Sequence, residues 1–268
     1  MSDAEPGPRP ARIRREPPRF RAVAVAGVRA VTPRLVRVTL AGPELAGLQI
    51  DRPAASVRLL LPEPGADLVL PAWNGNEFLL PGGARPTIRT LTPRRFDPDG
   101  PALDVEVVVH DGGAASQWAT TAPVGAPAAV SGPGRGYAIE PEAPAFLLAG
   151  DETAIPAIGQ LLEVLPPATP VQVHVEVAAP DARLALPRHP RATVAWHDLA
   201  PGQVPGEALV AAVRGAALDP GTRVWVAGEA AAVQRIRRHL FAERGVPRAQ
   251  ATVRGYWKRG RAGDGGAD

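Results

Sequence analysis

Residues 147–165 read LLAGDETAIPAIGQLLEVL, and this stretch decides the fold of the second half of the chain. It begins as the end of an apolar strand, makes a turn, and continues as a long amphipathic helix from about Thr153 to Leu165. Nucleotide-binding sites are usually built from a strand, a turn and a helix in this order. The stretch therefore predicts an α/β domain.

The turn carries two carboxylates, Asp151 and Glu152, at the mouth of the helix. Free amides at a helix N-terminus attract a phosphate, and acidic side chains placed there repel it. An acidic turn is typical of a helix that caps itself, with Asp151 or Thr153 bonding the free amides and Pro156 in the first turn, where no donor is missed. We therefore expect a polar wall between two domains rather than a pyrophosphate cradle.

Strands and helices continue to alternate after this stretch. Apolar runs predict strands at 171–178, 192–198 and 223–228, and helical periodicity predicts helices at 207–218 and 229–245. The alternation indicates a parallel sheet with crossover helices. The last helix has one apolar face and ends at a glycine suited to a C-cap. These residues are Val233, Ile236, Leu240, Phe241 and Gly245.

The first half consists of short Val-rich runs in which apolar and polar residues alternate. They occur at 20–31, 34–42, 56–62 and 103–110, and Pro, Gly and Asp separate them at short intervals. This pattern indicates an antiparallel barrel or sandwich, and no convincing helix is expected before about Val130.

We therefore predict a β-barrel domain followed by an α/β domain, with a hinge near Pro141–Pro144. The predicted segments are a disordered N-terminal segment at 1–17, the antiparallel β-barrel domain at 18–141, the parallel-sheet α/β domain at 142–261 and a disordered tail at 262–268.

Composition limits the class of protein. The chain has 268 residues, of which 45% are hydrophobic and 21% charged, close to the average of soluble two-domain proteins. No apolar run approaches the roughly 20 residues that a membrane-spanning helix needs, and residues 1–16 lack the apolar region of a secretory signal. Cys is absent, which excludes disulfides and thiolate metal sites and is compatible with a reducing cytoplasm.

Two stretches of the first half carry residue types that hold anions. RTLTPR, residues 89–94, falls between predicted barrel strands, and arginine pairs well with phosphates. In VVVHDGGAASQWA, residues 107–119, Gly112 and Gly113 let the backbone approach a ligand, and Ser116 with the amides around it can bind a phosphate as a helix start does. RTLTPR alone is not decisive, because a strand-end arginine is most often solvated.

Taken together, the motifs resemble those of the siderophore-interacting proteins, a branch of the ferredoxin-reductase-like flavoproteins that reduces ferric siderophores. RTLTPR is similar to the R-x-Y-[ST] signature of these flavoproteins, with Leu91 in place of Tyr. Residues 107–119 with SGPGRGY at 131–137 are similar to the G-P-A-S-x-W-A loop, with Ala114 where Pro is common.

The acidic turn is the most specific part of the resemblance. AGDETAIPAI, residues 149–158, matches the strand-turn-helix element of that branch nearly letter for letter. VAGEAAAVQRIRRHL at 226–240 and VRGYWKRG at 253–260 complete the match, which covers about residues 18–260.

The resemblance implies an FAD site. It pairs Arg89 with the FAD pyrophosphate, places Leu91 where an aromatic residue usually lies on the isoalloxazine, and brings Thr92 to the flavin N5 region. Leucine gives up roughly 0.5–1.5 kcal/mol of aromatic pairing geometry there. The other residues that the resemblance places at the cofactors are His110, Gly113, Ala115, Ser116, Trp118, Asp151, Thr153, Tyr256 and Trp257.

A shallow basic pocket for an anionic ferric siderophore is also implied, because clustered positive charge holds such a ligand and raises its on-rate. Its candidate residues are Arg58, Arg135, Arg254, Lys258 and Arg259. NADPH or NADH is implied as the electron donor. Arg183 and Arg188 can reach a 2′-phosphate, whereas Glu176 or Asp181 can favour the unphosphorylated ribose, so the choice of donor stays open.

We therefore expect a cytoplasmic, monomeric ferric-siderophore reductase that passes electrons from NAD(P)H through FAD to Fe(III) and binds neither nucleic acid nor membrane. No side chain is expected to act as an acid or base. Three alternatives remain: a general NAD(P)H:flavin or ferredoxin-type reductase with a protein acceptor, a non-catalytic flavin- or chelate-binding protein, and an Arg-rich barrel that binds single-stranded nucleic acid.

Overall fold

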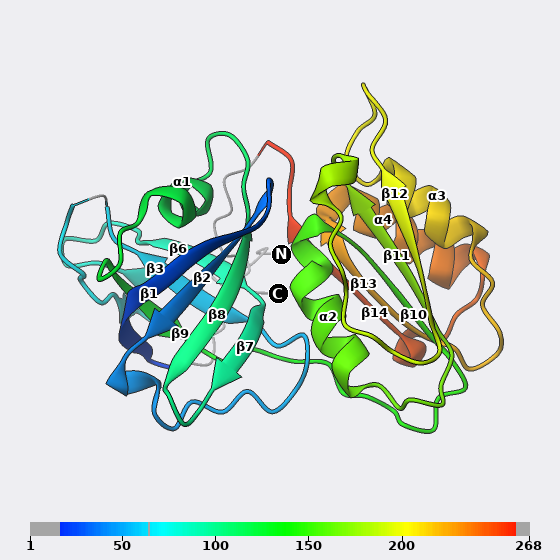
Figure 1. Cartoon of the computed structure of the whole chain (residues 1–268), viewed down its shortest axis with the longest axis horizontal. Coiled ribbons are helices and arrows are strands. Elements are labelled where there is room, and N and C mark those ends of the chain that lie inside the picture. Colours follow the sequence, from blue (N-terminus) through cyan, green and yellow to red (C-terminus); the bar gives the residue numbers. More distant parts are fainter. Residues whose placement is uncertain (1–16, 64, 261–268) are drawn as a thin grey trace, which may run out of the picture.

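The computed structural model describes residues 17–63 and 65–260. These form two domains side by side, with helix α2 (Ile155–Val164) of the second domain facing the first (Figure 1). The predicted disordered segments, 1–17 and 262–268, lie outside the described residues apart from Pro17.

The first domain is built on a seven-stranded sheet in the order β6-β3-β9-β1-β2-β8-β7. All of its strand pairs are antiparallel, which confirms the predicted architecture. The strands are β1 (Phe20–Thr32), β2 (Leu35–Ala41), β3 (Val57–Leu61), β6 (Thr87–Leu91), β7 (Pro93–Asp97), β8 (Ala102–Val108) and β9 (Pro127–Ser131). The shorter elements are η1 (Pro43–Leu45), β4 (Ala72–Trp73) and β5 (Phe78–Leu79).

The sheet curls into a barrel. Strands β6 and β7 lie at its opposite edges, yet only Thr92 separates them in the chain. Edge strands joined by one residue have to approach each other, so the sheet wraps around its core. The period-two pattern of the sequence supplies that core, because alternate residues of β8 point inward: Leu103, Val105 and Val107 are 0%, 0% and 3% exposed.

Two predictions for this half are wrong. AASQWATT forms a helix, α1 (Ala114–Thr121), where none was expected; eight residues give too little periodicity to be distinguished from a loop. RTLTPR is not a connection between strands: Arg89 lies within β6, and Arg94 lies within β7. These two strands are only five residues long, and Pro and Arg hide their alternation.

The second domain is a five-stranded sheet in the order β12-β11-β10-β13-β14, and all of its pairs are parallel. The predicted parallel α/β architecture is confirmed. The strands are β10 (Phe146–Asp151), β11 (Val171–Val177), β12 (Ala192–Asp198), β13 (Arg223–Glu229) and β14 (Ala251–Trp257). Sequence patterns did not predict β14, because its ATVRGYW run lacks a continuous apolar stretch.

Helices cover both faces of this sheet. Helix α2 packs on one face, and α3 (Glu207–Gly215) and α4 (Ala230–Arg238) pack on the other. The apolar face predicted for the last helix is confirmed, because Val233, Ile236 and Leu240 are buried against the sheet. The helix ends in a π-turn, η4 (His239–Glu243), and Gly245 follows at φ +67°, a conformation that favours glycine.

Polar contacts join the two domains along α2. Gln160 accepts a hydrogen bond from the Ala54 amide at 2.8 Å and donates one to the Pro93 carbonyl at 2.7 Å. Arg94 forms an ion pair with Glu163 at 2.6 Å. The barrel is therefore tied to the helix that the acidic turn begins.

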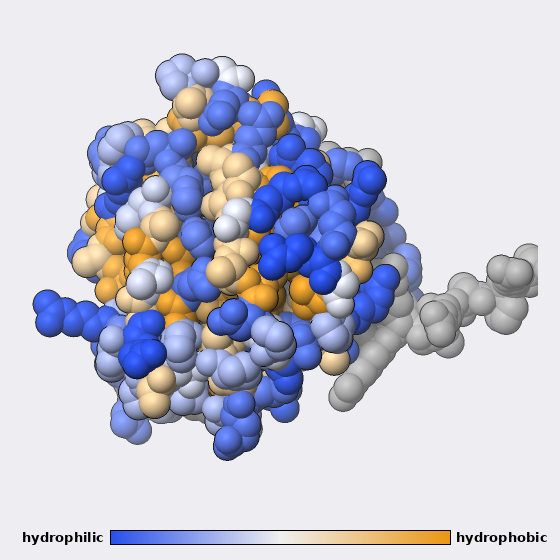
Figure 2. Space-filling model, turned by 90° about the vertical axis from the view of Figure 1, so that its right-hand side faces the viewer, coloured by the Kyte–Doolittle hydropathy of each residue, from blue (hydrophilic) through white to orange (hydrophobic). Residues whose placement is uncertain are grey.

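On the side of the α/β domain, hydrophilic residues surround the hydrophobic areas of the surface (Figure 2). No helix among the described residues is long and apolar enough to cross a membrane.

Candidate functional site

The end of β14 reaches the seam of the barrel, which is the place where the edge strands β6 and β7 approach each other around Thr92. The Thr92 hydroxyl, between β6 and β7, lies 3.5 Å from the Tyr256 hydroxyl and donates a hydrogen bond to it. Thr92 is buried, and burial raises the pKa of Tyr256. Next along β14, Trp257 donates its indole N–H to Asp151 Oδ2 at 2.7 Å. Four residues that sequence reasoning placed at one site, from three separate stretches, are thus brought together.

Strand β6 presents an arginine that no carboxylate of the described residues neutralises. Arg89 Nη1 donates to the Ile88 carbonyl at 2.8 Å, and Arg89 has no ion pair within the described part of the chain. Leu91 is half-buried and packs against the barrel core. Arg89 is therefore free to bind an anion, and part of Leu91 remains exposed at the seam.

The start of α1 is a second place where an anion can bind. Gly113 is the N-cap residue, and within residues 17–63 and 65–260 no side chain accepts from the first-turn amides of the helix. A Cβ on Gly113 would lie 2.5 Å from Cε1 of His110, so glycine lets the exposed imidazole lie against the helix start. Strands β6 and β8, which lead to Arg89 and to this turn, contact each other.

Other residues of this segment hold the turn rather than point to a ligand. The Ser116 hydroxyl accepts from the His110 amide at 3.1 Å and donates to the Val108 carbonyl at 3.2 Å. Ala115 and Trp118 pack against the barrel core. The indole N–H of Trp118 is buried and has no hydrogen-bond partner among the described residues. Of this segment, the first-turn amides of α1 and Nε2 of His110 are left to meet a ligand, since His110 Nδ1 contacts the Asp111 carbonyl at 3.1 Å.

These residues fit the pyrophosphate of FAD. An uncapped helix start and an unpaired arginine are the donors that a diphosphate requires. The roles predicted for individual residues at the flavin stay predictions.

The predicted basic residues lie near the same seam. Arg254 of β14 donates to the Arg135 carbonyl at 3.0 Å, so β14 and the 131–137 loop meet. Arg58 in β3 pairs in register with Ser131 at the start of that loop, and burial lowers the Arg58 pKa. Lys258 and Arg259 are exposed. None of these five residues has an ion pair in the described structure.

The acidic turn caps itself, as expected. Asp151 Oδ1 accepts from the Thr153 amide at 2.9 Å and from its hydroxyl at 2.5 Å, and Oδ2 accepts from the Glu229 amide at 2.9 Å as well as from Trp257. Burial raises the Asp151 pKa, and these hydrogen bonds oppose the rise. Both oxygens are occupied by the protein, so Asp151 joins three elements.

The second acid of the turn, Glu152, contacts both domains. Its carboxylate pairs with Arg34 Nε at 3.0 Å, across the domain boundary, and accepts from the Ala178 amide at 2.7 Å. The polar wall that we expected between the domains therefore contains a cation from the barrel, in the turn between β1 and β2. Sequence reasoning missed Arg34, because nothing along the chain marks an arginine that pairs with a residue 118 positions away.

Two further carboxylates cap helices at the same edge of the sheet. Glu229 accepts from the Ala231 and Ala232 amides at the start of α4. Glu176 accepts from the Gly206 amide at 2.6 Å and the Leu209 amide at 2.9 Å at the start of α3, so the suggestion that it binds a ribose is wrong. Arg183 pairs with Asp198, and the suggestions for Arg188 and Asp181 stay predictions.

Glu229 was missed although a sequence signal for it exists. The strand ends AGDE and AGEA, at 149–152 and 227–230, repeat a glycine followed by an acid before a helix.

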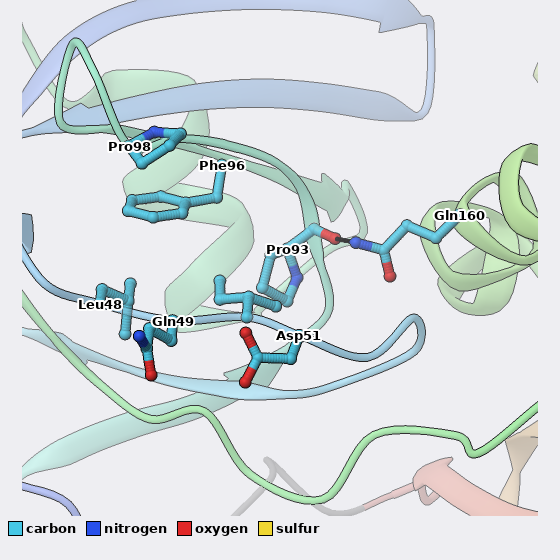
Figure 3. Close-up of a pocket in the computed structure, with 8 residues that line it drawn as sticks. Leu48, Gln49, Asp51, Pro93, Phe96, Pro98 and Gln160 are labelled. Carbon is cyan, nitrogen blue, oxygen red and sulfur yellow. Dashed lines mark hydrogen bonds between the residues drawn. The ribbon is translucent and has the colours of Figure 1, made fainter.

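A cavity of about 380 Å³ lies elsewhere on the domain boundary, where loop residues 48–51, β7 and α2 meet (Figure 3). Gln160 reaches toward Pro93 at its margin. None of the predicted site residues lines it. Within residues 17–63 and 65–260 there is also no cluster of three or more side chains that could hold a metal ion.

Comparisons with known proteins show which family the chain belongs to. Residues 24–137 match the model of the siderophore-interacting FAD-binding domain, and residues 143–260 match that of the siderophore-interacting protein. A siderophore utilization protein from T. fusca has a similar structure, with a TM-score of 0.81 and 37% identity, covering 92% of this chain and 95% of that one. The siderophore-interacting protein SipS from Aeromonas hydrophila has a TM-score of 0.76 and 31% identity, covering 91% and 93%.

Ferric vibriobactin reductase ViuB from Vibrio cholerae is 28% identical over 86% of each chain. Because the two family models together span nearly all of the described residues, the chain belongs to the siderophore-interacting protein family and carries its FAD-binding domain.

Proposed function

We propose that this protein is a ferric-siderophore reductase that holds FAD and takes electrons from NADPH or NADH, releasing Fe(II) in the cytoplasm. The observation that carries the proposal is the meeting of Thr92, Tyr256 and Trp257 at the barrel seam, in a family whose relative ViuB is a ferric vibriobactin reductase. Monomeric state and the absence of nucleic-acid and membrane partners stay predictions.

Arg89 and the amides at the start of α1 would hold the FAD pyrophosphate, and Thr92 with the end of β14 would border its ring. Bound FAD supplies the exchange between a two-electron donor and one-electron reduction of Fe(III). The protein's part is to bind and orient, because electron transfer of this kind needs no side chain to move a proton.

The basic residues would hold the acceptor. Arg254 of the α/β domain contacts the Arg135 carbonyl of the barrel, Arg58 pairs in register with Ser131 of the same loop, and none of the three has an ion pair among the described residues. Catecholate-type ferric siderophores are anionic, so unpaired cations beside the flavin would bind them and raise their on-rate. Lys258 and Arg259 would extend this rim.

Anaerobic stopped-flow spectroscopy tests the proposal. The purified protein should be yellow, NADPH or NADH should bleach its flavin absorption, and a ferric siderophore should restore it. Arg58→Ala and Lys258→Ala should slow only the second phase, with Arg95→Ala, an exposed arginine of β7, as the control. A colourless protein, or flavin reoxidised by a ferredoxin but not by ferric chelates, would contradict the proposal.

A further inference from the structure

Three parallel strands of the α/β domain carry buried carboxylates at the edge where nucleotides usually bind. Asp151 ends β10, Glu229 ends β13, and Glu176 lies one residue before the end of β11; they are 8%, 5% and 3% exposed. In open α/β sheets, ligands bind outside the carboxyl ends of the strands, where the strand order reverses. Here the order reverses between β10 and β13, so Asp151 and Glu229 lie on the two sides of that crevice.

Each of these carboxylates occupies backbone N–H groups that a diphosphate would need. Asp151 takes the Thr153 amide ahead of α2, Glu229 takes two amides at the start of α4, and Glu176 takes two at the start of α3. Helices α3 and α4 are therefore capped by acids of the protein, and Asp151 caps the 3-10 turn (Glu152–Ala154) that leads into α2. Helix α1 has no such cap among the described residues.

Protein atoms also fill the space beside the glycines at this edge. Dinucleotide-binding turns use glycine so that a pyrophosphate can come close to the backbone. Here a Cβ on Gly228 would lie 2.7 Å from Asp151 Oδ2, and one on Gly150 would lie 2.3 Å from the Ala154 Cβ. These glycines make room for protein atoms and leave no cradle for a phosphate.

Four carboxylates lie at this edge, and the exposed cations Lys258 and Arg259 follow β14 beside them. Glu152 has an ion-pair partner, Arg34, but Asp151, Glu176 and Glu229 have none within the described residues. A diphosphate in the crevice would therefore be repelled by these carboxylates. The repulsion would be strong, because buried charges are screened little by water.

We propose that this crevice accepts the nicotinamide half of the electron donor and excludes its diphosphate, with Asp151 and Glu229 as the residues that determine this specificity. The inference rests on the proposed use of NADPH or NADH. The reduced nicotinamide ring is uncharged and meets no repulsion, whereas the diphosphate has to lie outside the crevice. The donor would then be recognised mainly by its ring.

Two measurements on the FAD-loaded protein test this. ADP-ribose, which carries the diphosphate without the nicotinamide, should show no saturable binding at millimolar concentration in isothermal titration calorimetry. Reduced nicotinamide mononucleotide, which lacks the diphosphate, should bleach the flavin within about tenfold of the rate for NADH, because the missing group contributes little binding energy. Micromolar binding of ADP-ribose, or a loss of a hundredfold or more with the mononucleotide, would overturn the proposal.

Charge-removing variants locate the effect. Asp151→Asn and Glu229→Gln should raise the affinity for ADP-ribose by about tenfold or more, since a nearby negative charge is lost. Glu142→Gln removes an exposed carboxylate before β10 and is the matched control. An unchanged lack of binding in both folded variants would contradict the role of these two residues.

The wild-type titration needs no variant, so it decides the proposal even where a variant fails to fold. Failure of the proposed function looks different: no nicotinamide compound would bleach the flavin, while the ADP-ribose titration would still report on the crevice.

Discussion

The start of α1 in the barrel and the starts of α2, α3 and α4 in the α/β domain follow the same order of strand, turn and helix. Their N-terminal amides nevertheless have different partners. At α1 the cap is Gly113, with no side-chain acceptor, and an unpaired arginine lies in a neighbouring part of the barrel. In the α/β domain, carboxylates from the strand ends take amides at the starts of α3 and α4 and in the turn that leads into α2.

The difference teaches that the strand-turn-helix pattern does not by itself make a phosphate site. What decides is whether the protein has already satisfied the amides, since an occupied N–H offers nothing to a ligand and its acidic partner repels one. We propose that the barrel keeps its helix start for an anionic cofactor, whereas the α/β domain uses the starts of α3 and α4 and the turn before α2 to hold itself together.

Asp151→Ala should have the largest effect on stability, because Asp151 bonds more parts of the α/β domain than the other capping carboxylates do. The substitution leaves the Glu229 amide, the Trp257 indole N–H and the Thr153 amide without their acceptor in a buried region. We expect a loss of about 3–5 kcal/mol in the free energy of unfolding, because each orphaned buried donor costs about 1–3 kcal/mol. Urea unfolding measures it, and Glu142→Ala is the exposed control. A loss below about 1 kcal/mol would contradict the hub role of Asp151.

Arg89→Ala tests the proposed diphosphate site of the barrel. Loss of a charge-assisted contact to a diphosphate costs about 1.5–3 kcal/mol, or roughly 10- to 150-fold in affinity. Titration of the apoprotein with FAD should show this change, and Arg95→Ala should leave the affinity as it was. Equal affinities for the two variants would mean that Arg89 does not hold the cofactor.

Ala114→Asp would give α1 an acidic first turn. The carboxylate should stabilise the helix by about 0.3–1 kcal/mol through the helix dipole and yet weaken FAD binding by about tenfold through repulsion. Thr120→Asp, near the other end of α1, is the control. If both variants bind FAD as the wild type does, the helix start is not part of the FAD site.

Glu152→Gln tests the ion pair between the domains, and its expected effect on stability is the smallest. It removes the charge that pairs with Arg34 across the domains but keeps an oxygen for the Ala178 amide. Because Arg34 is about one-third exposed, we expect a loss of only about 1 kcal/mol in the free energy of unfolding. Arg34→Gln should give the same loss, and the double variant should add little to it if the two groups act as a pair.

The pattern of the sequence was enough for the architecture of both domains. Period-two runs placed the antiparallel strands, and alternating strands and helices placed the parallel sheet, because in both cases the buried face is visible within one segment. The missed elements include α1, β6, β7, β9 and β14, which are short or interrupted by polar residues, so their burial depends on neighbours that are distant in the chain.

The sequence predicted which residues lie at the candidate site better than it predicted what each of them does. The capping by Asp151 follows from local chemistry, since its partner Thr153 is two residues away. The ion pair of Glu152 with Arg34 and the capping of α3 by Glu176 join residues far apart in the chain, so no local pattern reports them. The ribose role suggested for Glu176 failed for that reason.

The central claim is that the barrel binds a diphosphate and the α/β crevice does not, and the affinity of the apoprotein for FAD against riboflavin tests it most directly. Flavin fluorescence titration gives both dissociation constants. We predict that FAD binds at least about 100-fold more tightly than riboflavin, because Arg89 and the α1 amides contact only the former's diphosphate. Equal affinities for the two flavins, or no binding of either, would contradict the account.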